Sequence, residues 1–196
     1  MRARAASVDR TRESIVVAAC DRLRERSDPV SMLEIAARAG VSRNTLYRHF
    51  GSVTDLLDAV ASDLLGRARF GRLLAAVSEP DPVVALREVI RAGFGIWALD
   101  PSLVKGMLAL ARVQSEAVPV IAQLDQGRVD IMVTLVGRLG DEGRLRPGLS
   151  RARAVDLLVV LTEFGNWQLL VEGRGRSIRT ADAMLLELAL DAVTLR

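Results

Sequence analysis

The chain has 196 residues, of which 50% are hydrophobic and only 4% aromatic. A chain of this length can bury a sizeable core, and its richness in alanine, leucine, valine and arginine favours helices over strands. One histidine and one cysteine are too few for a His/Cys metal cluster, for a triad with a spare histidine or for an intrachain disulfide. We therefore expect neither an enzyme nor a metal site nor a cofactor, and we expect Cys20 to lie in the core.

Positive charge is concentrated in the N-terminal third of the chain. Residues 1–72 contain thirteen arginines and nine acidic residues, a net charge of +4, whereas the remaining residues carry a net charge of −1. This asymmetry is typical of a face that binds DNA phosphates, although an ordinary solvated surface would also produce it. Because no apolar stretch follows the first arginines, the sequence lacks the pattern of a signal peptide, and we expect a cytoplasmic protein.

Residues 31–50 have the pattern of two short helices joined by a tight turn. Ser31 and Glu34 have the spacing of a capping box, which predicts a helix from about Met32. We expect the inner face of this helix to carry Leu33, Ile35, Ala36 and Ala39. Gly40 then ends the helix, because a left-handed turn residue costs least when it has no Cβ.

A second helix is predicted after Val41, with Ser42 as its N-cap. Leu46 and Phe50 face inward in this helix. The other side chains form an exposed polar set that can bond base edges or phosphates in a major groove: Arg43, Asn44, Thr45, Tyr47 and Arg48. This arrangement is typical of a helix-turn-helix DNA reader.

The run of residues 35–50 resembles the DNA-binding signature of the TetR family of bacterial transcriptional regulators. The resemblance extends back through residues 15–23 as a first helix and forward through residues 52–57 as the start of a fourth. It implies an all-α homodimer. The N-terminal three-helix helix-turn-helix DNA-binding domain would occupy residues 1–58, and a C-terminal helical ligand-binding and dimerisation domain would occupy residues 59–196.

The resemblance also implies roles for side chains of the second reader helix. Tyr47 and His49 would contact phosphates, while Arg43, Asn44 and Thr45 would read bases. His49 has a second interpretation, in which it caps the helix or packs at its end. The predicted DNA-binding residues are Ser42, Arg43, Asn44, Thr45, Tyr47, Arg48 and His49.

From about residue 53 onward, apolar helical stretches alternate with short breaks, and no strand-like alternation bounded by hairpin turns is present. A fourth helix is predicted from Val53 to about Ala68, with Ser52 and Asp55 as its cap. Proline and glycine then punctuate the chain. They divide it into predicted segments near 83–99, 102–115, 119–143, 151–172 and 180–195.

The segment from Ala152 to Glu172 is apolar on most of its circumference, so a helix there must be covered on every side. Asp156 and Glu163 interrupt the run, which argues against a membrane span. The final segment carries an apolar stripe of Met184, Leu185, Leu188, Ala192 and Leu195. Two such helices from each subunit would pack as a four-helix dimer interface, and a core within one chain is the other interpretation.

Bulky or pliable side chains in the C-terminal part are suited to line an apolar effector cavity. The predicted ligand-binding residues are Phe94, Trp97, Met107, Met132, Glu163, Phe164 and Trp167, each of which also suits plain core or interface packing. Glu163 has three interpretations: it faces the cavity, pairs across the dimer or lies at an edge.

These features predict a ligand-responsive transcriptional regulator, by default a repressor. It would bind an inverted-repeat operator in double-stranded DNA as a homodimer through its last two helices, and it would release the operator when a small molecule binds. The alternative is a helical protein of the same fold that binds a protein partner and has lost specific DNA reading. The polar set at residues 43–48 favours the DNA reader. We expect no membrane association.

Overall fold

The computed structural model describes the backbone of residues 2–26 and 28–195, and side chains from residue 9 onward within those ranges. Every regular element in the described residues is a helix, and their β pairing is an isolated bridge between Leu145 and Thr194. The predicted all-α fold is therefore confirmed. Contacts divide the chain into two compact units, Met1–Arg67 with Asp100–Leu124 and Ala68–Leu99 with Asp125–Arg196.

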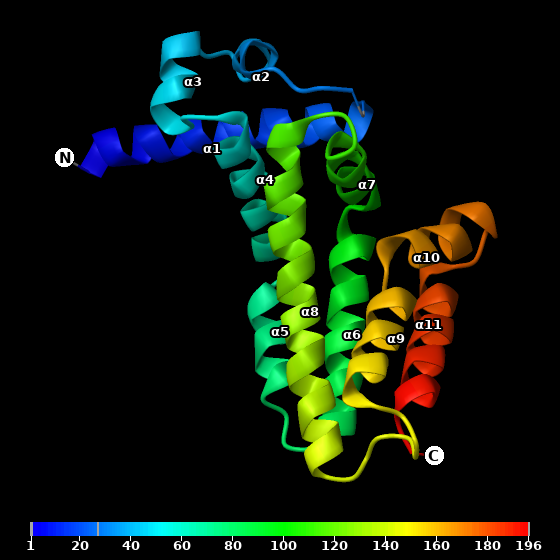
Figure 1. The fold of residues 1–196 in the computed structure, drawn as a ribbon. Coiled ribbons are helices and arrows are strands. Elements are labelled where there is room, and N and C mark those ends of the chain that lie inside the picture. The colour runs from blue at the N-terminus through cyan, green and yellow to red at the C-terminus, as the bar shows by residue number, and fades with distance from the viewer. Residues whose placement is uncertain (1, 27, 196) are drawn as a thin grey trace. The chain divides into compact units, whose positions relative to one another are not determined.

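The first unit is built around its N-terminal helix. Its elements are α1 (Arg2–Glu25), α2 (Met32–Arg38), α3 (Arg43–His49), α4 (Val53–Arg67), α7 (Pro101–Leu110) and the 3₁₀ turn η1 (Ser115–Ala117). Helix α1 contacts α2, α4 and α7 (Figure 1). The core of this unit includes the fully buried side chains of Ile15, Ile35, Leu46, Leu56 and Leu103. Cys20 is buried here too, as predicted.

Helix α7 packs closely against α1. A Cβ built on Gly106 would collide with the carbonyl oxygen of Leu23 and lie 2.8 Å from its carbonyl carbon. Asp100 caps the start of α7 by accepting from the Leu103 N–H at 3.2 Å, and its carboxylate also accepts from Arg24 of α1 at 2.6 Å and from Arg67 of α4 at 3.4 Å. Three helices of the first unit therefore meet at one carboxylate.

Hydrogen bonds tie the stretch after α7 to the loop before α2 and to the start of α4. The side-chain amide of Gln114 accepts from the Val30 N–H at 2.8 Å and donates to the Val30 carbonyl at 3.1 Å. The Thr54 hydroxyl at the start of α4 donates to the Glu116 carbonyl at 3.0 Å. Residues far apart in sequence thus hold the loop before α2 and the start of α4 in place.

The second unit contains helices that the sequence predicted and one that it did not. Its elements are α5 (Phe70–Val77), α6 (Pro82–Leu99), α9 (Arg151–Leu161), α10 (Phe164–Gln168), the π-helical turn η2 (Leu169–Gly173) and α11 (Ile178–Val193), while α8 (Val118–Asp141) runs through both units. Helix α5 was not predicted. It begins after Arg69, whose φ of 56° lies in the left-handed region. A residue in this conformation does not continue a right-handed helix, so α4 and α5 are separate.

The single helix predicted over residues 151–172 is wrong, because the chain breaks after Leu161. Two side chains donate hydrogen bonds to backbone carbonyls at this break. The Thr162 hydroxyl donates to the Leu158 carbonyl at 2.6 Å, and the Asn166 amide donates to the Val160 carbonyl at 2.6 Å. The Leu158 carbonyl keeps its helical bond from the Thr162 N–H at 2.9 Å. The Val160 carbonyl, which a continuous helix would bond to the N–H of residue 164, instead accepts from the Asn166 amide and from the Glu163 N–H at 3.3 Å.

The segment predicted as 102–115 is also shorter than expected, since α7 ends at Leu110. Within the described residues, no helix alone has the length and apolarity to cross a membrane. Helix α9 and the segment Phe164–Gly173 reach that composition only when taken together, and they are bent by 41° at the break between them.

Candidate DNA-binding interface and effector site

The turn between α2 and α3 has the geometry that the sequence predicted. Gly40 has a φ of +67°, and the Val41 N–H donates to the Ala36 carbonyl at 3.0 Å. Ser42 then caps α3, because its hydroxyl oxygen accepts from the Thr45 N–H at 3.1 Å. A second contact of 2.9 Å joins the two hydroxyls of this cap. The short helix α3 therefore has a fixed start.

Of the predicted inner face of α2 and α3, four side chains are buried, Ala39 is half-buried and one position is wrong. Leu46 and Phe50 are buried, as are Ile35 and the neighbouring alanine of α2, but Leu33 is 65% exposed. Met32 is buried in its place. The reason is helical periodicity: positions 32, 35, 36 and 39 follow the i, i+3, i+4, i+7 pattern of one face, and position 33 lies off it.

A buried arginine that was not predicted joins α1 to the start of α2. The side chain of Arg22 is 1% exposed and donates to Glu34 at 2.5 Å and to Asp28 at 2.9 Å. It also donates to the backbone carbonyl of Pro29 at 3.2 Å. The Ser31 half of the predicted capping box is present, with its hydroxyl accepting from the N–H of residue 34, while the Glu34 carboxylate is engaged by the arginine.

A signal for this buried arginine exists in the sequence. Position 22 continues the apolar stripe of Ile15, Ala18 and Ala19 at helical spacing, so its side chain had to point inward. An inward arginine needs acceptors, because an unpaired buried charge is strongly unfavourable. Acidic residues at 28 and 34 supply them.

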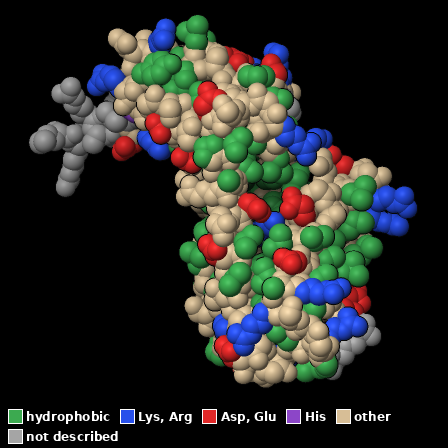
Figure 2. Space-filling model, viewed as in Figure 1, with side chains coloured by type: hydrophobic (Ala, Val, Ile, Leu, Met, Phe, Trp, Pro, Cys, Tyr) green, Lys and Arg blue, Asp and Glu red, His purple; other side chains and the backbone are tan. Residues whose placement is uncertain are grey.

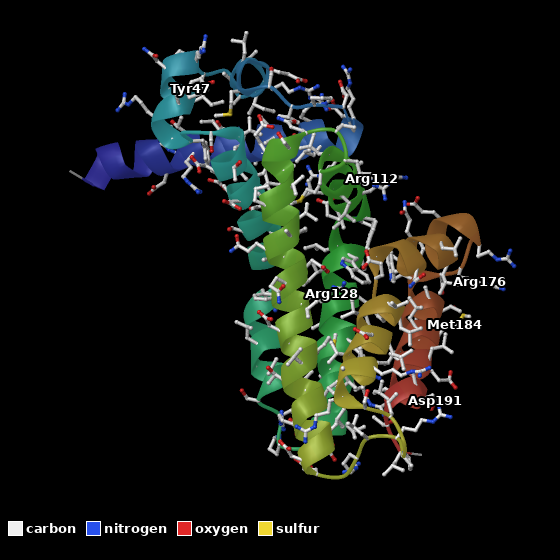
Figure 3. All side chains as sticks on the ribbon, viewed as in Figure 1. Tyr47, Arg112, Arg128, Arg176, Met184 and Asp191 are labelled. Carbon is white, nitrogen blue, oxygen red and sulfur yellow. The ribbon has the colours of Figure 1, made fainter. Side chains whose placement is uncertain are left out.

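The outer face of α3 carries the predicted polar set. Arg43, Asn44, Tyr47 and Arg48 are exposed, and Thr45 and His49 are half-buried. Figure 3 shows Tyr47 on α3, where the Arg43 guanidinium lies 5.4 Å from the centre of its ring. The predicted cap of α4 is also present, with the Ser52 hydroxyl accepting from the Asp55 N–H at 3.1 Å. This surface offers several hydrogen-bond donors without an acidic neighbour on the same helix.

Four of the predicted effector residues form one aromatic cluster in the second unit. Phe94 and Trp97 of α6 have ring centres 5.4 Å apart, and Trp97 meets Phe164 edge-on at 5.8 Å and Trp167 edge-on at 6.4 Å. Phe164 and Trp167 of α10 stack at 5.9 Å. Such offset and edge-on pairs are favourable beyond the area they bury. The helix break after α9 is what brings the α10 rings to α6.

The buried ring of Trp167 has a polar partner. Its indole N–H donates to the Asp182 carboxylate of α11 at 2.7 Å. Burial raises the pKa of Asp182 above its usual value, and the bond from the indole opposes that rise. The cluster is thus anchored to α11 by a hydrogen bond.

The other predicted effector residues are more scattered. Met132 is buried on α8 within the second unit, whereas Met107 is buried on α7 within the first. Glu163 is exposed and accepts from Arg128 at 3.1 Å. The largely buried Arg128 side chain on α8 (Figure 3) also donates to Asp125 at 2.7 Å and to the Val159 carbonyl at 2.9 Å. Of the three interpretations of Glu163, an ion pair at the edge between α9 and α10 fits this geometry.

Among the hollows on the described surface, two are lined by residues other than the predicted effector residues. One of about 600 Å³ lies between α1 and α4 and includes Cys20 and Arg67. The other, of about 820 Å³, lies between α6 and α11 and includes Arg87 and Asp182. Asp182 therefore lines a hollow and also bonds to the aromatic cluster.

Helices α9 and α11 expose apolar side chains. Val160 of α9 is 62% exposed, and Leu188 and Met184 of α11 are 52% and 40% exposed. Leu169 of the π-helical turn η2 is 58% exposed. Figure 2 shows hydrophobic side chains gathered over α9 and α11 on the viewed face. Exposed apolar side chains in such a group are typical of an interaction surface.

The geometry described so far defines the class: an all-α protein with an N-terminal helix-turn-helix and a separate helical unit. A family model described as bacterial regulatory proteins, tetR family, matches residues 15–60. The HTH-type transcriptional repressor BepR of Brucella suis biovar 1 (strain 1330) is 32% identical over an alignment of 148 residues, and the match covers 71% of this chain and 69% of the relative. The chain therefore belongs to the TetR family of bacterial regulatory proteins, and it is a transcriptional regulator that binds DNA.

Solved structures share the fold over nearly the whole chain. NalD, the secondary repressor of the MexAB-OprM multidrug efflux pump in Pseudomonas aeruginosa, is 22% identical with a TM-score of 0.75, covering 96% of this chain and 98% of that one. SmeT represses the SmeDEF multidrug efflux pump of Stenotrophomonas maltophilia. Its complex with triclosan is 20% identical with a TM-score of 0.72, covering 94% of this chain and 92% of that one.

Proposed function

We propose that this regulator is a ligand-responsive repressor that binds an inverted-repeat operator as a homodimer. The observation that carries the proposal is the outer face of α3, where Arg43, Asn44, Tyr47 and Arg48 are exposed on a helix held from behind by Leu46. A helix with this distribution fits a major groove. The names of the relatives, BepR, NalD and SmeT, describe repressors, which supports repression over activation.

Within α3, Arg43, Asn44 and Thr45 read bases, whereas the Tyr47 hydroxyl and His49 contact phosphates, with Ser42 and Arg48 completing the interface. The functional division lies near residue 58, with DNA binding before it and effector binding and dimerisation after it. Helix α7 packs on the DNA-binding helices without entering the groove. A regulator of chromosomal DNA acts in the bacterial cytoplasm, where we place this protein.

Selection of duplexes from a randomised pool by the purified wild-type protein tests the DNA-binding proposal. We expect a palindromic consensus that binds far more tightly than a scrambled duplex, with affinity that falls steeply as salt rises. Asn44→Ala lowers discrimination by about 1–3 kcal/mol at one base pair of each half-site. Equal weak binding to all duplexes would instead favour a protein-partner-binding role for the same fold.

The dimer forms through α9 and α11, because these helices expose the apolar side chains that a partner subunit would cover. Leu188→Glu places a charge on this surface and should convert the dimer to a monomer in light scattering. The matched control is Leu74→Glu on α5, whose side chain is similarly exposed at 51%. A Leu74→Glu monomer beside a Leu188→Glu dimer would contradict the proposed interface.

The effector binds at the aromatic cluster of Phe94, Trp97, Phe164 and Trp167, with Met132 and Glu163 at its edges. Met107 belongs to the first unit, and we assign it no effector contact. Because the chain has two tryptophans and both lie in the cluster, tryptophan emission reports on this site. Triclosan, the ligand in the SmeT complex, is the first probe.

Bound effector favours an arrangement of the dimer that no longer matches the operator, so it shifts the population toward the free protein. An effector of this kind quenches tryptophan emission and releases the selected duplex over the same concentration range. Release of DNA without any change in emission would place the effector site elsewhere.

A further inference from the structure

Arg43 and Tyr47 form a cation–π pair on the outer face of α3. The two residues are four positions apart, so their side chains lie on the same side of the helix. The carbon at the centre of the Arg43 guanidinium is 5.4 Å from the centre of the Tyr47 ring. Tyr47 is 42% exposed, and Arg43 is exposed as well. The pair therefore stands on the surface that faces DNA in the proposed function.

The arginines of the first unit differ in what holds them. Arg22 and Arg24 are held by carboxylates, which occupy the N–H groups at the edge of each guanidinium. The contact that Arg43 makes is with a ring, whose centre lies 5.4 Å from the guanidinium carbon, and among the described residues no carboxylate pairs with its N–H donors. Such an edge can donate hydrogen bonds to the O6 and N7 acceptors of a guanine in the major groove.

Contact with a ring also limits the motion of a long side chain. A free arginine loses rotamer entropy when it binds, which weakens the contact. The Tyr47 ring restricts Arg43 before DNA arrives, and the capped start of α3 at Ser42 fixes the backbone that carries both side chains. The geometry therefore prepares one guanidinium edge for a base.

We propose that the Tyr47 ring is a positioning element for Arg43, and that this pair sets specificity for a guanine in each half-site of the operator. The inference rests on the proposed function, in which α3 enters the major groove. It gives the ring of Tyr47 a role separate from the phosphate contact of its hydroxyl. The two roles can be separated because phenylalanine keeps the ring and lacks the hydroxyl.

The test uses the consensus duplex selected by the wild-type protein and its single-base-pair variants. Arg43→Ala identifies the base pair at which discrimination is lost. Tyr47→Leu then removes the ring and keeps an apolar side chain, and Tyr47→Phe is its matched control. Both positions are exposed, and circular dichroism verifies that each variant is folded.

We expect Tyr47→Leu to lower discrimination about two- to fivefold at the base pair assigned to Arg43 and to leave the base pair assigned to Asn44 unchanged. Tyr47→Phe keeps discrimination at both base pairs, although its affinity for all duplexes falls. In the Arg43→Ala background, Tyr47→Leu has no further effect on discrimination, because the partner it positions is gone.

Loss of affinity by Tyr47→Leu that is equal on every duplex, or an effect that adds fully to that of Arg43→Ala, would overturn the positioning role. A failure of the proposed function has a different signature. In that case the wild-type protein selects no consensus from the pool, before any variant is compared.

Discussion

The close approach of α7 to α1 makes Gly106 a position where replacing glycine by alanine should lower the stability of the fold, although the same replacement usually raises it in a helix. Alanine in a helix interior is normally about 0.8–1.0 kcal/mol better than glycine. At Gly106 the added methyl collides with backbone, the carbonyl group of Leu23, which cannot rotate away as a side chain would. Overpacking costs about 1–3 kcal/mol. Because rigid backbone is displaced, we expect an overpacking cost of about 3 kcal/mol, at the top of that range. After the gain in helix propensity, the free energy of unfolding should fall by about 2 kcal/mol.

The matched control is Gly95 of α6, where an added Cβ has no neighbouring atom within 4 Å. Gly95→Ala should gain up to about 1 kcal/mol from helix propensity alone. The two variants should therefore differ by about 3 kcal/mol in opposite directions from the wild type. In a chain of this size, a loss of about 2 kcal/mol lowers the melting temperature by about 4–8 °C.

Urea unfolding followed by circular dichroism, at one fixed protein concentration, measures both variants. The midpoint of Gly106→Ala should fall and that of Gly95→Ala should rise, with unchanged slopes. If Gly106→Ala raises the midpoint as much as Gly95→Ala does, the contact between the helices is looser than described, and the reasoning is refuted.

Three further predictions concern charged groups and the thiol. Partial burial raises the pKa of Asp100, but the bonds from Arg24 and the Leu103 N–H outweigh it and hold the pKa below its usual value. The ionised carboxylate thus stabilises the fold above the unfolded pKa near 4, and that stability disappears as pH falls through the folded pKa. Urea midpoints of Asp100→Asn should accordingly depend less on pH below about 4 than those of the wild type, and parallel curves would contradict this. Burial, assisted by the negative charge of Asp63, raises the pKa of Cys20 to about 11. Alkylation of the native protein near pH 8 should be at least about a hundredfold slower than in urea, because the thiolate is the reactive form, and equal rates would show an accessible thiol. Arg128→Ala should lower the free energy of unfolding by about 1.5–3 kcal/mol, because it removes the hydrogen bonds from Arg128 to the junction of α9 and α10. It should also shift tryptophan emission. The exposed Arg153 provides the control substitution to alanine, and an equal effect there would remove the special role of Arg128.

The parts of the reader that could be predicted are those determined by neighbours in sequence. Ser42 and Gly40 act on backbone groups a few residues away, so their spacing alone indicates the cap and the turn. Leu33 was placed on the wrong face because a helix that starts at Met32 buries positions 32, 35 and 36. A shift of one residue in the assumed face was enough for this error.

The break between α9 and α10 could not be predicted because much of what stabilises it comes from elsewhere in the chain. Arg128, more than thirty residues earlier, donates to the Val159 carbonyl and to Glu163 at the junction. Local propensity over residues 151–172 favours one helix, and tertiary contacts override it. The four aromatic residues were grouped in the sequence by their type, and their contact in the fold depends on this break.

The contacts of α7 have a consequence for exchanging parts between regulators of this family. Asp100, Gly106 and Gln114 complete the packing of α1, α4 and the loop before α2, although they follow those elements by at least thirty residues. A chimaera that transfers residues 1–67 alone would remove the Asp100 carboxylate from Arg24, leaving that of Asp21, and would expose the surface of α1 that α7 covers. Grafting operator specificity onto a foreign sensor therefore requires two segments, 1–67 and 100–124, or the exchange of the outer residues of α3 within an otherwise intact chain.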